Sequence, residues 1–256
     1  MAVVLFSGGL DSTTISYDVG KNPFRYGLSR ETGWELILLT GVFSPEERAK
    51  KEADLSDLVT EIEGVSLLPV RHEFLEVPDV FGSFAPEIPV LRGSVNLNSP
   101  MEQKGGSSSQ RALQSYPYTP GLHLLYASAA VNLLLRARTP HHTRPVVLCG
   151  FKYEGFGWDL HDSGRLANSD TSPVFIEKLN QLVEVSVEGV LAPRFRAPFL
   201  ESRMDRYAVL EMAYSLGVPV EKTSSCIQGW MQNCGHCIQC VVRNQAMAAY
   251  KAVTGE

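Results

Sequence analysis

Residues 7–12 combine glycines, hydroxyls and one carboxylate directly after a short hydrophobic run. Ala2–Phe6 predicts a buried strand, and Ser7-Gly8-Gly9 then turns the chain toward a helix. Backbone N–H groups at the start of a helix, approached closely through glycines, form an anion cradle. Ser12 adds a hydroxyl donor, and Asp11 suits such a site if Mg²⁺ lies between its carboxylate and a phosphate. The stretch predicts a phosphate site, with a tight turn of small residues as the alternative.

Four of the five cysteines lie between residues 226 and 240. Cys234, Cys237 and Cys240 follow a C-x₂-C-x₂-C spacing, and Cys226 completes a set of four thiols. Four thiolates are the usual closed ligand set of structural Zn²⁺, with an iron–sulfur cluster or a redox dithiol as alternatives. Because no coordination position is left for water, we expect the metal to brace the fold. Cys149 ends a hydrophobic run and is expected to be a buried small hydrophobic residue, with a catalytic nucleophile as the alternative.

Hydrophobic runs separated by helical stretches predict a doubly wound, mainly parallel α/β sheet. We expect strands over 2–6, 34–40, 66–70 and 146–150, and helices over 11–18, 45–62, 121–136, 172–185, 204–216 and 241–252. Ligands of such sheets bind at the carboxyl ends of the strands, where Ser7-Gly8-Gly9 lies.

The chain divides into two predicted parts. Residues 1–200 form a nucleotide-binding α/β domain, and residues 201–256 form a small helical segment that binds zinc. Residues 76–120 are rich in Pro, Gly and Ser and predict a long loop, either a functional lid or a disordered segment.

Composition narrows the class of partner. The net charge of −5 provides no basic field for tracking nucleic acid, so small molecules or proteins are the expected partners. No run of about 18 apolar residues predicts a membrane span, and no leader peptide is evident at the N-terminus, so we expect a cytoplasmic protein.

The S-G-G-x-D-S spacing of residues 7–12 resembles the pyrophosphate loop of the ATP pyrophosphatases, and no Walker A lysine follows it. Members of that superfamily cleave ATP between the α- and β-phosphates and leave AMP on the substrate. The resemblance implies that the loop holds the leaving pyrophosphate and its Mg²⁺, and that backbone at the end of the second strand meets adenine. The implied nucleotide-binding residues are Ser7, Gly8, Gly9, Leu10, Asp11, Ser12, Thr13, Leu39 and Thr40.

Together with C-x₇-C-G-x-C-x₂-C-x₂-R, which ends at Arg243, this loop resembles the 7-cyano-7-deazaguanine synthase family. The segments TPGLHLLYASAA, DTSPVFIEKLN and FRAPFL extend the resemblance over most of the chain. It implies an adenine nucleotide alpha hydrolase-like fold, ATP, Mg²⁺ and structural Zn²⁺ as cofactors, and a homodimer. The family adenylates the carboxylate of 7-carboxy-7-deazaguanine, adds ammonia to give an amide and dehydrates the amide to a nitrile.

The chain departs from the family around the second substrate. A Tyr-Gly-Gln-Arg-His type segment is replaced by Val42–Arg48, and Pro-Gly-Arg-Asn becomes Pro120–His123, which removes an arginine. A Ser-Gly-Tyr-Pro-Asp-Cys-Arg run is also absent. His123 could replace one hydrogen bond of the lost guanidinium. The predicted substrate-binding residues are His123, Asp162, Asp170 and Phe175.

Lys152 follows the fourth strand and is expected to neutralise charge at the α-phosphate, which makes Asp11, Ser12 and Lys152 the predicted catalytic set. Arg194 and Arg196 could clamp a phosphate or lie in a solvated loop.

The combined hypothesis is an ATP-dependent ligase that adenylates the deazapurine carboxylate and transfers it to ammonia or to a protein amine. The protein amine would apply to divergent relatives associated with antiphage defence. A ligase or thiolase acting on tRNA is a second enzyme class, disfavoured by the acidic composition. A non-catalytic nucleotide-binding partner is the third reading.

Overall fold

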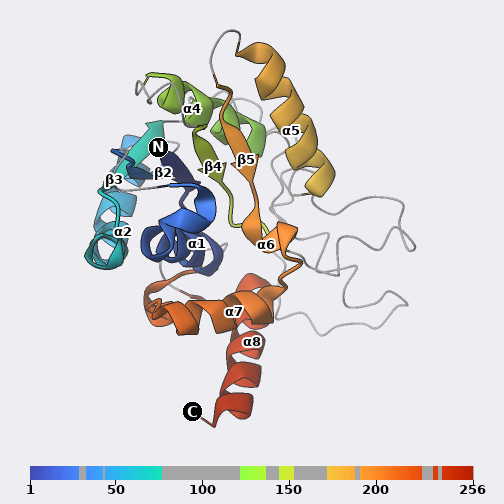
Figure 1. The fold of residues 1–256 in the computed structure, drawn as a ribbon. Coiled ribbons are helices and arrows are strands. Elements are labelled where there is room, and N and C mark those ends of the chain that lie inside the picture. The colour runs from blue at the N-terminus through green and yellow to red at the C-terminus, as the bar shows by residue number, and fades with distance from the viewer. Residues whose placement is uncertain are drawn as a thin grey trace, which may run out of the picture.

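The computed structural model describes residues 1–28, 33–42, 44–76, 122–136, 144–152, 172–187, 191–226, 233–235 and 238–255. Within these ranges, a five-stranded sheet carries helices on both faces (Figure 1). The predicted loop over 76–120 falls almost wholly outside the described residues, as do Asp162, Asp170 and Cys237.

The strands of this sheet are all parallel and lie in the order β3-β2-β1-β4-β5. Ala2 pairs with Leu36 on one side and with Val146 on the other. The central strands read as unalternated hydrophobic runs because helices bury both of their faces. The bounds are β1 (Ala2–Leu5), β2 (Leu36–Val42), β3 (Val70–Glu76), β4 (Val146–Leu148) and β5 (Arg194–Arg196). The predicted parallel α/β sheet is confirmed.

The strand order changes direction next to β1. The chain moves outward from β1 through β2 to β3, and then returns to place β4 on the opposite side of β1. In open parallel sheets, ligands bind beyond the carboxyl ends of the strands at such a switch point. Residues 7–9 follow β1 and residues 149–152 follow β4, so both segments border this crevice.

Two separate hydrophobic clusters cover the two faces of the sheet. One cluster contains side chains of α1 (Leu10–Lys21), α2 (Pro45–Val65) and α7 (Arg206–Leu216). The other contains side chains of α4 (Leu122–Arg136), α5 (Pro173–Ser186) and α6 (Pro198–Glu201). No helix within the described ranges has both the length and the hydrophobicity to cross a lipid bilayer.

The last helix, α8 (Ile238–Thr254), lies beside α7 (Figure 1). Tyr214 of α7 stacks on Tyr250 of α8 with ring centroids 4.4 Å apart. Both guanidinium nitrogens of Arg206 donate to Gln239 Oε1 at 3.1 Å. Because α7 also packs on α1, the C-terminal helices are attached directly to the phosphate-loop side of the sheet.

The third strand begins later than its predicted position over 66–70. Ser66 Oγ accepts a hydrogen bond from Leu68 N–H at 3.1 Å and donates to Leu68 O at 2.8 Å, which closes a turn before the strand. Pro69 has no N–H to donate to a ladder. The observed strand, β3, therefore runs from Val70 to Glu76. Its polar residues interrupt the hydrophobic run by which a strand is predicted from sequence.

The segment of Arg194 and Arg196 forms strand β5, not a solvated loop. Arg196 Nη2 lies 2.6 Å from Glu201 Oε2, so its charge is paired within the fold. The hydrophobic Phe195 between the two arginines is 1% exposed and anchors the strand. Three residues are too few to show the alternation of a strand, which is why the sequence did not predict it.

The outer edge of β5 is covered by the side chain of Asn180 from α5. Asn180 Oδ1 accepts from Phe195 N–H at 2.8 Å, and its Nδ2 donates to Phe195 O at 3.0 Å. The side-chain amide thereby makes the two hydrogen bonds that a further strand would make.

Asn180→Ala is expected to lower the free energy of unfolding by about 1–3 kcal/mol, because it leaves both polar groups of a buried backbone unpaired. Urea unfolding measures the change. Gln181→Ala is the matched control, since its amide bonds only to surface side chains on the same helix. Equal changes in the two variants would contradict the role assigned to Asn180.

Candidate active site

The turn after β1 leads directly into the first turn of α1, whose backbone amides have no partners within the helix. Gly8 has φ of +73°, a left-handed conformation that glycine adopts without steric cost. A Cβ on Gly9 would lie 3.2 Å from Ser224 O and from Ser7 Oγ, so the turn is packed closely from both sides. The turn therefore has the shape of an anion cradle at the positive end of the α1 dipole.

The hydroxyls of Ser7 and Ser12 hold this turn together. Ser12 Oγ donates to Gly9 O at 3.2 Å and accepts from Ser7 N–H at 3.2 Å. The Ser7 hydroxyl, 3.1 Å away, can then act as the donor to Ser12. All these bonds are long, so a phosphate oxygen that offers stronger, charge-assisted bonds could replace them.

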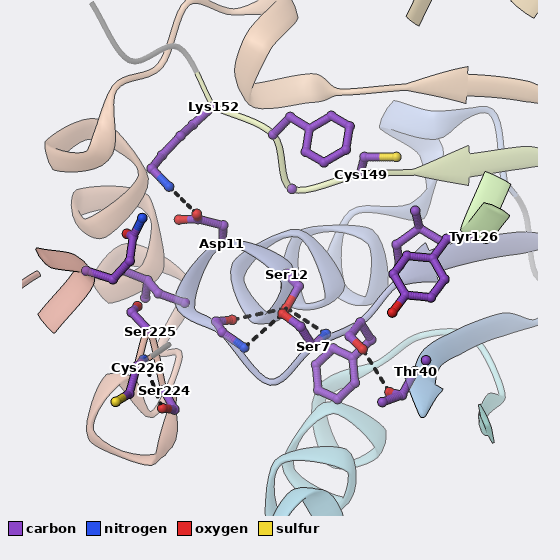
Figure 2. A pocket seen from close by; sticks show the side chains of 18 of the residues that line it. Ser7, Asp11, Ser12, Thr40, Tyr126, Cys149, Lys152, Ser224, Ser225 and Cys226 are labelled. Carbon is purple, nitrogen blue, oxygen red and sulfur yellow. Dashed lines mark hydrogen bonds and ion pairs between the residues drawn. The ribbon is translucent and has the colours of Figure 1, made fainter. Parts of the chain in front are cut away.

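Lys152, which follows β4, and Asp11, in the first turn of α1, form an ion pair (Figure 2). Their side chains are 13% and 28% exposed. Gly150 brings the two segments together, because a Cβ there would lie 2.9 Å from the carbonyl carbon of Asp11. A cation and a carboxylate thus stand at the phosphate loop.

The end of β2 is tied to the end of β1 by Thr40 and His72. Thr40 Oγ1 donates to Phe6 O at 2.8 Å and lies 2.9 Å from His72 Nε2. Burial lowers the pKa of His72 to about 4, so the ring is neutral at pH 7. Because the Thr40 proton is used on Phe6, we assign the Nε2–H tautomer, which donates to Thr40.

Lys51 and Tyr126 lie beside Gly41 at the end of β2. Lys51 Nζ donates to Gly41 O at 2.6 Å and pairs with Glu47 Oε1 at 3.0 Å. Burial lowers the pKa of Lys51 and raises that of Tyr126 to about 12. A Cβ on Gly41 would lie 2.3 Å from the Tyr126 ring, so only glycine leaves room for the phenol.

One cavity of about 440 Å³ joins these groups at the switch point of the sheet. Lys152 lies on one side of it, and Tyr126 and Thr40 lie on the other (Figure 2). The cavity walls come from the turn after β1, the ends of β2 and β4, α4, the segment 224–226 and α8.

Three cysteine sulfurs gather where the segment 224–226 meets α8. The Sγ atoms of Cys226, Cys234 and Cys240 all lie within 4.8 Å of one another, and those of Cys234 and Cys240 are 3.9 Å apart. Tetrahedral Zn²⁺ with Zn–S bonds of about 2.3 Å requires sulfurs about 3.8 Å apart. The three thiols therefore fit a metal such as zinc. Cys226 also lines the cavity, which places the cluster beside the phosphate loop.

The structure brings most of the predicted nucleotide-binding residues to the cavity. The predicted residues that line it are Ser7, Gly9, Leu10, Asp11, Ser12, Leu39, Thr40, Lys152 and Cys226. Thr13 faces away, fully buried, and its hydroxyl has no hydrogen-bond partner among the described residues.

The predicted substrate-binding residues are not gathered there by the described part of the chain. Phe175 packs on the cluster of the opposite face and does not line the cavity. The backbone of His123 belongs to α4, but its side chain lies outside the described part, together with Asp162 and Asp170. Cys149 is buried, as predicted, and burial raises its pKa to about 12.

Several cavity residues were not predicted, and they come from segments distant in sequence. These are Lys51, Tyr126, Arg206, Ser224, Ser225, Gln239 and Arg243. Arg243 did carry a sequence signal, its fixed distance from the cysteine motif. Lys51 carried none, since a lysine in a charged helix is usually solvated.

The buried imidazole of His72 gives a pH-dependent prediction. Between about pH 6.5 and 4, His72 is protonated in the unfolded chain but stays neutral in the folded protein. The free energy of unfolding therefore falls as the pH is lowered through that range. His72→Gln keeps an N–H donor for Thr40 but does not titrate. We expect the stability of the variant, followed by thermal unfolding from pH 7 to 4, to fall less steeply than that of the wild type. Parallel curves would contradict a neutral, buried His72.

The chain is similar in sequence to a family of known proteins. The family described as "Queuosine biosynthesis protein QueC" matches residues 156–251. A 7-cyano-7-deazaguanine synthase of Synechococcus elongatus is 26% identical, covering 96% of this chain and 90% of the relative. Those of Microcystis aeruginosa and Rhizobium johnstonii are 25% and 22% identical, covering 96% and 95% of this chain and 90% and 86% of the relatives. The chain is therefore similar to the QueC family over residues 156–251, and to these synthases over almost its whole length.

Proposed function

We propose that this protein is an ATP-dependent carbon–nitrogen ligase that acts on the carboxylate of 7-carboxy-7-deazaguanine or a related acid. The single observation that carries the proposal is the cavity in which the glycine turn after β1, the Asp11–Lys152 pair and the cysteine cluster meet. The relatives named 7-cyano-7-deazaguanine synthase support the choice of substrate.

The first step joins the organic acid to AMP. A carboxylate oxygen attacks the α-phosphorus of ATP, the bond from that phosphorus to the oxygen bridging to the β-phosphate breaks, and pyrophosphate leaves. The amides of the turn, now weakly bonded to the hydroxyls of Ser7 and Ser12, and those hydroxyls themselves would bind the β- and γ-phosphates, where negative charge accumulates. No protein nucleophile is required, because the work is positioning and charge stabilisation.

Nucleotide binding would separate Asp11 from Lys152. The Asp11 carboxylate is the hard oxygen ligand that Mg²⁺ prefers, and a bound Mg²⁺ would neutralise charge on the phosphates. Lys152 Nζ, released from Asp11, would then donate to an α-phosphate oxygen and favour attack there. The ion pair of the free protein holds both side chains at the mouth of the site before the substrate arrives.

The second step releases AMP. An amine nitrogen attacks the acyl carbon of the adenylate, the carbon–oxygen bond to AMP breaks, and an amide forms after the nitrogen loses a proton. With ammonia as the amine, dehydration of the amide with a second ATP gives a nitrile. The contribution of His123, Asp162 and Asp170 to acid binding remains part of the proposal, whereas Phe175 is dropped from it because it packs away from the cavity.

In the same proposal, residues 1–200 bind nucleotide and residues 201–256 supply the zinc site. Cys237 would complete the ligand set that Cys226, Cys234 and Cys240 begin, and four sulfurs leave no open position for a reactive water. Zinc would therefore fix the segment 224–226 against the phosphate loop and take no part in the reaction.

Asp11→Asn is expected to lower the rate of acid-dependent ATP–pyrophosphate exchange by roughly 100-fold or more, because the loop loses its metal ligand. Exchange of labelled pyrophosphate into ATP measures it. Asp57→Asn on the exposed face of α2 is the matched control and should exchange at the wild-type rate. Unchanged exchange in Asp11→Asn would count against the assignment.

Metal analysis of the purified protein is expected to find about one zinc ion per chain. Cys240→Ser should lose most of this zinc and unfold at a lower temperature, because metal binding is coupled to folding of the segment. Cys149→Ala, which removes a thiol outside the cluster, should keep it. Full zinc content in Cys240→Ser would exclude the cluster as the ligand set.

Mass spectrometry of the products identifies the acceptor. The protein is incubated with ATP, Mg²⁺ and 7-carboxy-7-deazaguanine, with and without ammonia. An amide or nitrile that depends on ammonia supports the synthase reaction, whereas an adduct on a protein amine identifies a protein acceptor. Absence of any product at a protein concentration that binds ATP would overturn the ligase proposal.

A further inference from the structure

Arg243 is a buried cation whose partners in the described chain are backbone carbonyls. Its side chain comes from α8, and the residue is 4% exposed. Nη1 donates to Thr223 O and Nη2 donates to Val220 O, each at 2.5 Å. No carboxylate among the described residues pairs with it. A buried guanidinium without an acidic partner is costly, so its position demands an explanation beyond packing.

One of these two carbonyls, that of Thr223, belongs to the peptide bond between Thr223 and Ser224. The N–H of that same peptide, on Ser224, donates to Gly8 O at 3.0 Å. The carbonyl of Ser224 is the atom that a Cβ on Gly9 would meet at 3.2 Å. A peptide bond is planar and rigid, so a force that fixes its carbonyl also fixes its N–H. Arg243 is thus connected through one peptide unit to the turn that forms the anion cradle.

The same guanidinium lies one helical turn after a cysteine of the cluster. Cys240 and Arg243 are three residues apart on α8 and therefore share a face of the helix. Arg243 also lines the cavity. Asn233, next to Cys234, supports the same peptide, with its Nδ2 3.3 Å from Thr223 O. The cysteine cluster and the phosphate loop consequently meet at Thr223 and Ser224.

We propose that Arg243 is a positioning residue that clamps the Thr223–Ser224 peptide against Gly8 and so transmits the order of the cysteine cluster to the phosphate loop. The inference rests on the proposed function, because it assigns the loop to the β- and γ-phosphates of ATP. It goes beyond that function in making pyrophosphate binding depend on a guanidinium that donates to backbone carbonyls of this chain.

The role predicts a selective loss of affinity. Arg243→Gln removes the charge and the fork, so the Thr223–Ser224 peptide loses its support and the loop loosens. We expect the affinity for Mg²⁺–ATP to fall roughly tenfold, equivalent to about 1.4 kcal/mol. Affinity for AMP, which has no β- or γ-phosphate, should change less than about twofold. A general loss of structure would weaken both ligands together.

Isothermal titration of ATP and of AMP into the full-length protein makes the test, with zinc content and melting temperature measured on each preparation. Arg243→Lys keeps the charge but not the planar fork and should lose ATP affinity by roughly threefold or more. Arg144→Gln is the matched control, since Arg144 also donates to a backbone carbonyl, Ala192 O at 2.9 Å, but away from the cavity. It should bind both nucleotides as the wild type does.

The outcomes separate the inference from the proposed function. Wild-type protein that does not prefer ATP over AMP overturns the proposed function and the inference with it. Wild-type preference for ATP, retained in a folded Arg243→Gln, overturns the inference alone, as does an equal loss of ATP and AMP affinity. Should the glutamine variant fail to fold, the lysine variant decides, and wild-type ATP affinity in it overturns the inference.

Discussion

The carbonyl of Gly8 accepts a hydrogen bond from Ser224, and this contact joins the two ends of the chain at the site. The turn that contains Gly8 borders the cavity through Ser7 and Gly9, yet glycines by themselves leave a turn free to move. The conformation of this turn must therefore be fixed by the groups that contact it. The Ser7 and Ser12 hydroxyls supply part of this constraint from within the turn, and the segment that leads into Cys226 supplies the rest from outside.

The sheet topology explains why such distant segments meet. Because the strand order reverses beside β1, the turns after β1 and β4 face one crevice, and Asp11 comes within reach of Lys152. Close backbone approach at Gly150 makes this distance short. Helix α7 then packs on α1, and α8, which packs on α7, carries Cys240 to the same place. Each group is thus placed by regular structure, which suits catalysis by positioning.

Local sequence signals were sufficient for the central strands, the glycine turn and the cysteine cluster. Their determinants lie within a few consecutive residues, such as a hydrophobic run followed by Ser7-Gly8-Gly9. The edge strands were harder. In β3, Arg71 and Glu73 form an ion pair on the strand and break the hydrophobic run, and β5 has only three residues. The cavity residues Lys51 and Tyr126 depend on packing between distant segments, which single-sequence patterns do not encode.

The central claim is that the turn after β1 binds the β- and γ-phosphates as a departing unit, so that AMP is transferred to an organic acid. Phosphorus NMR of ATP consumed in the presence of 7-carboxy-7-deazaguanine, Mg²⁺ and ammonium tests it most directly. The account predicts AMP and pyrophosphate as the products, in equal amounts, before any pyrophosphatase is added. Accumulation of ADP and orthophosphate alone would contradict it.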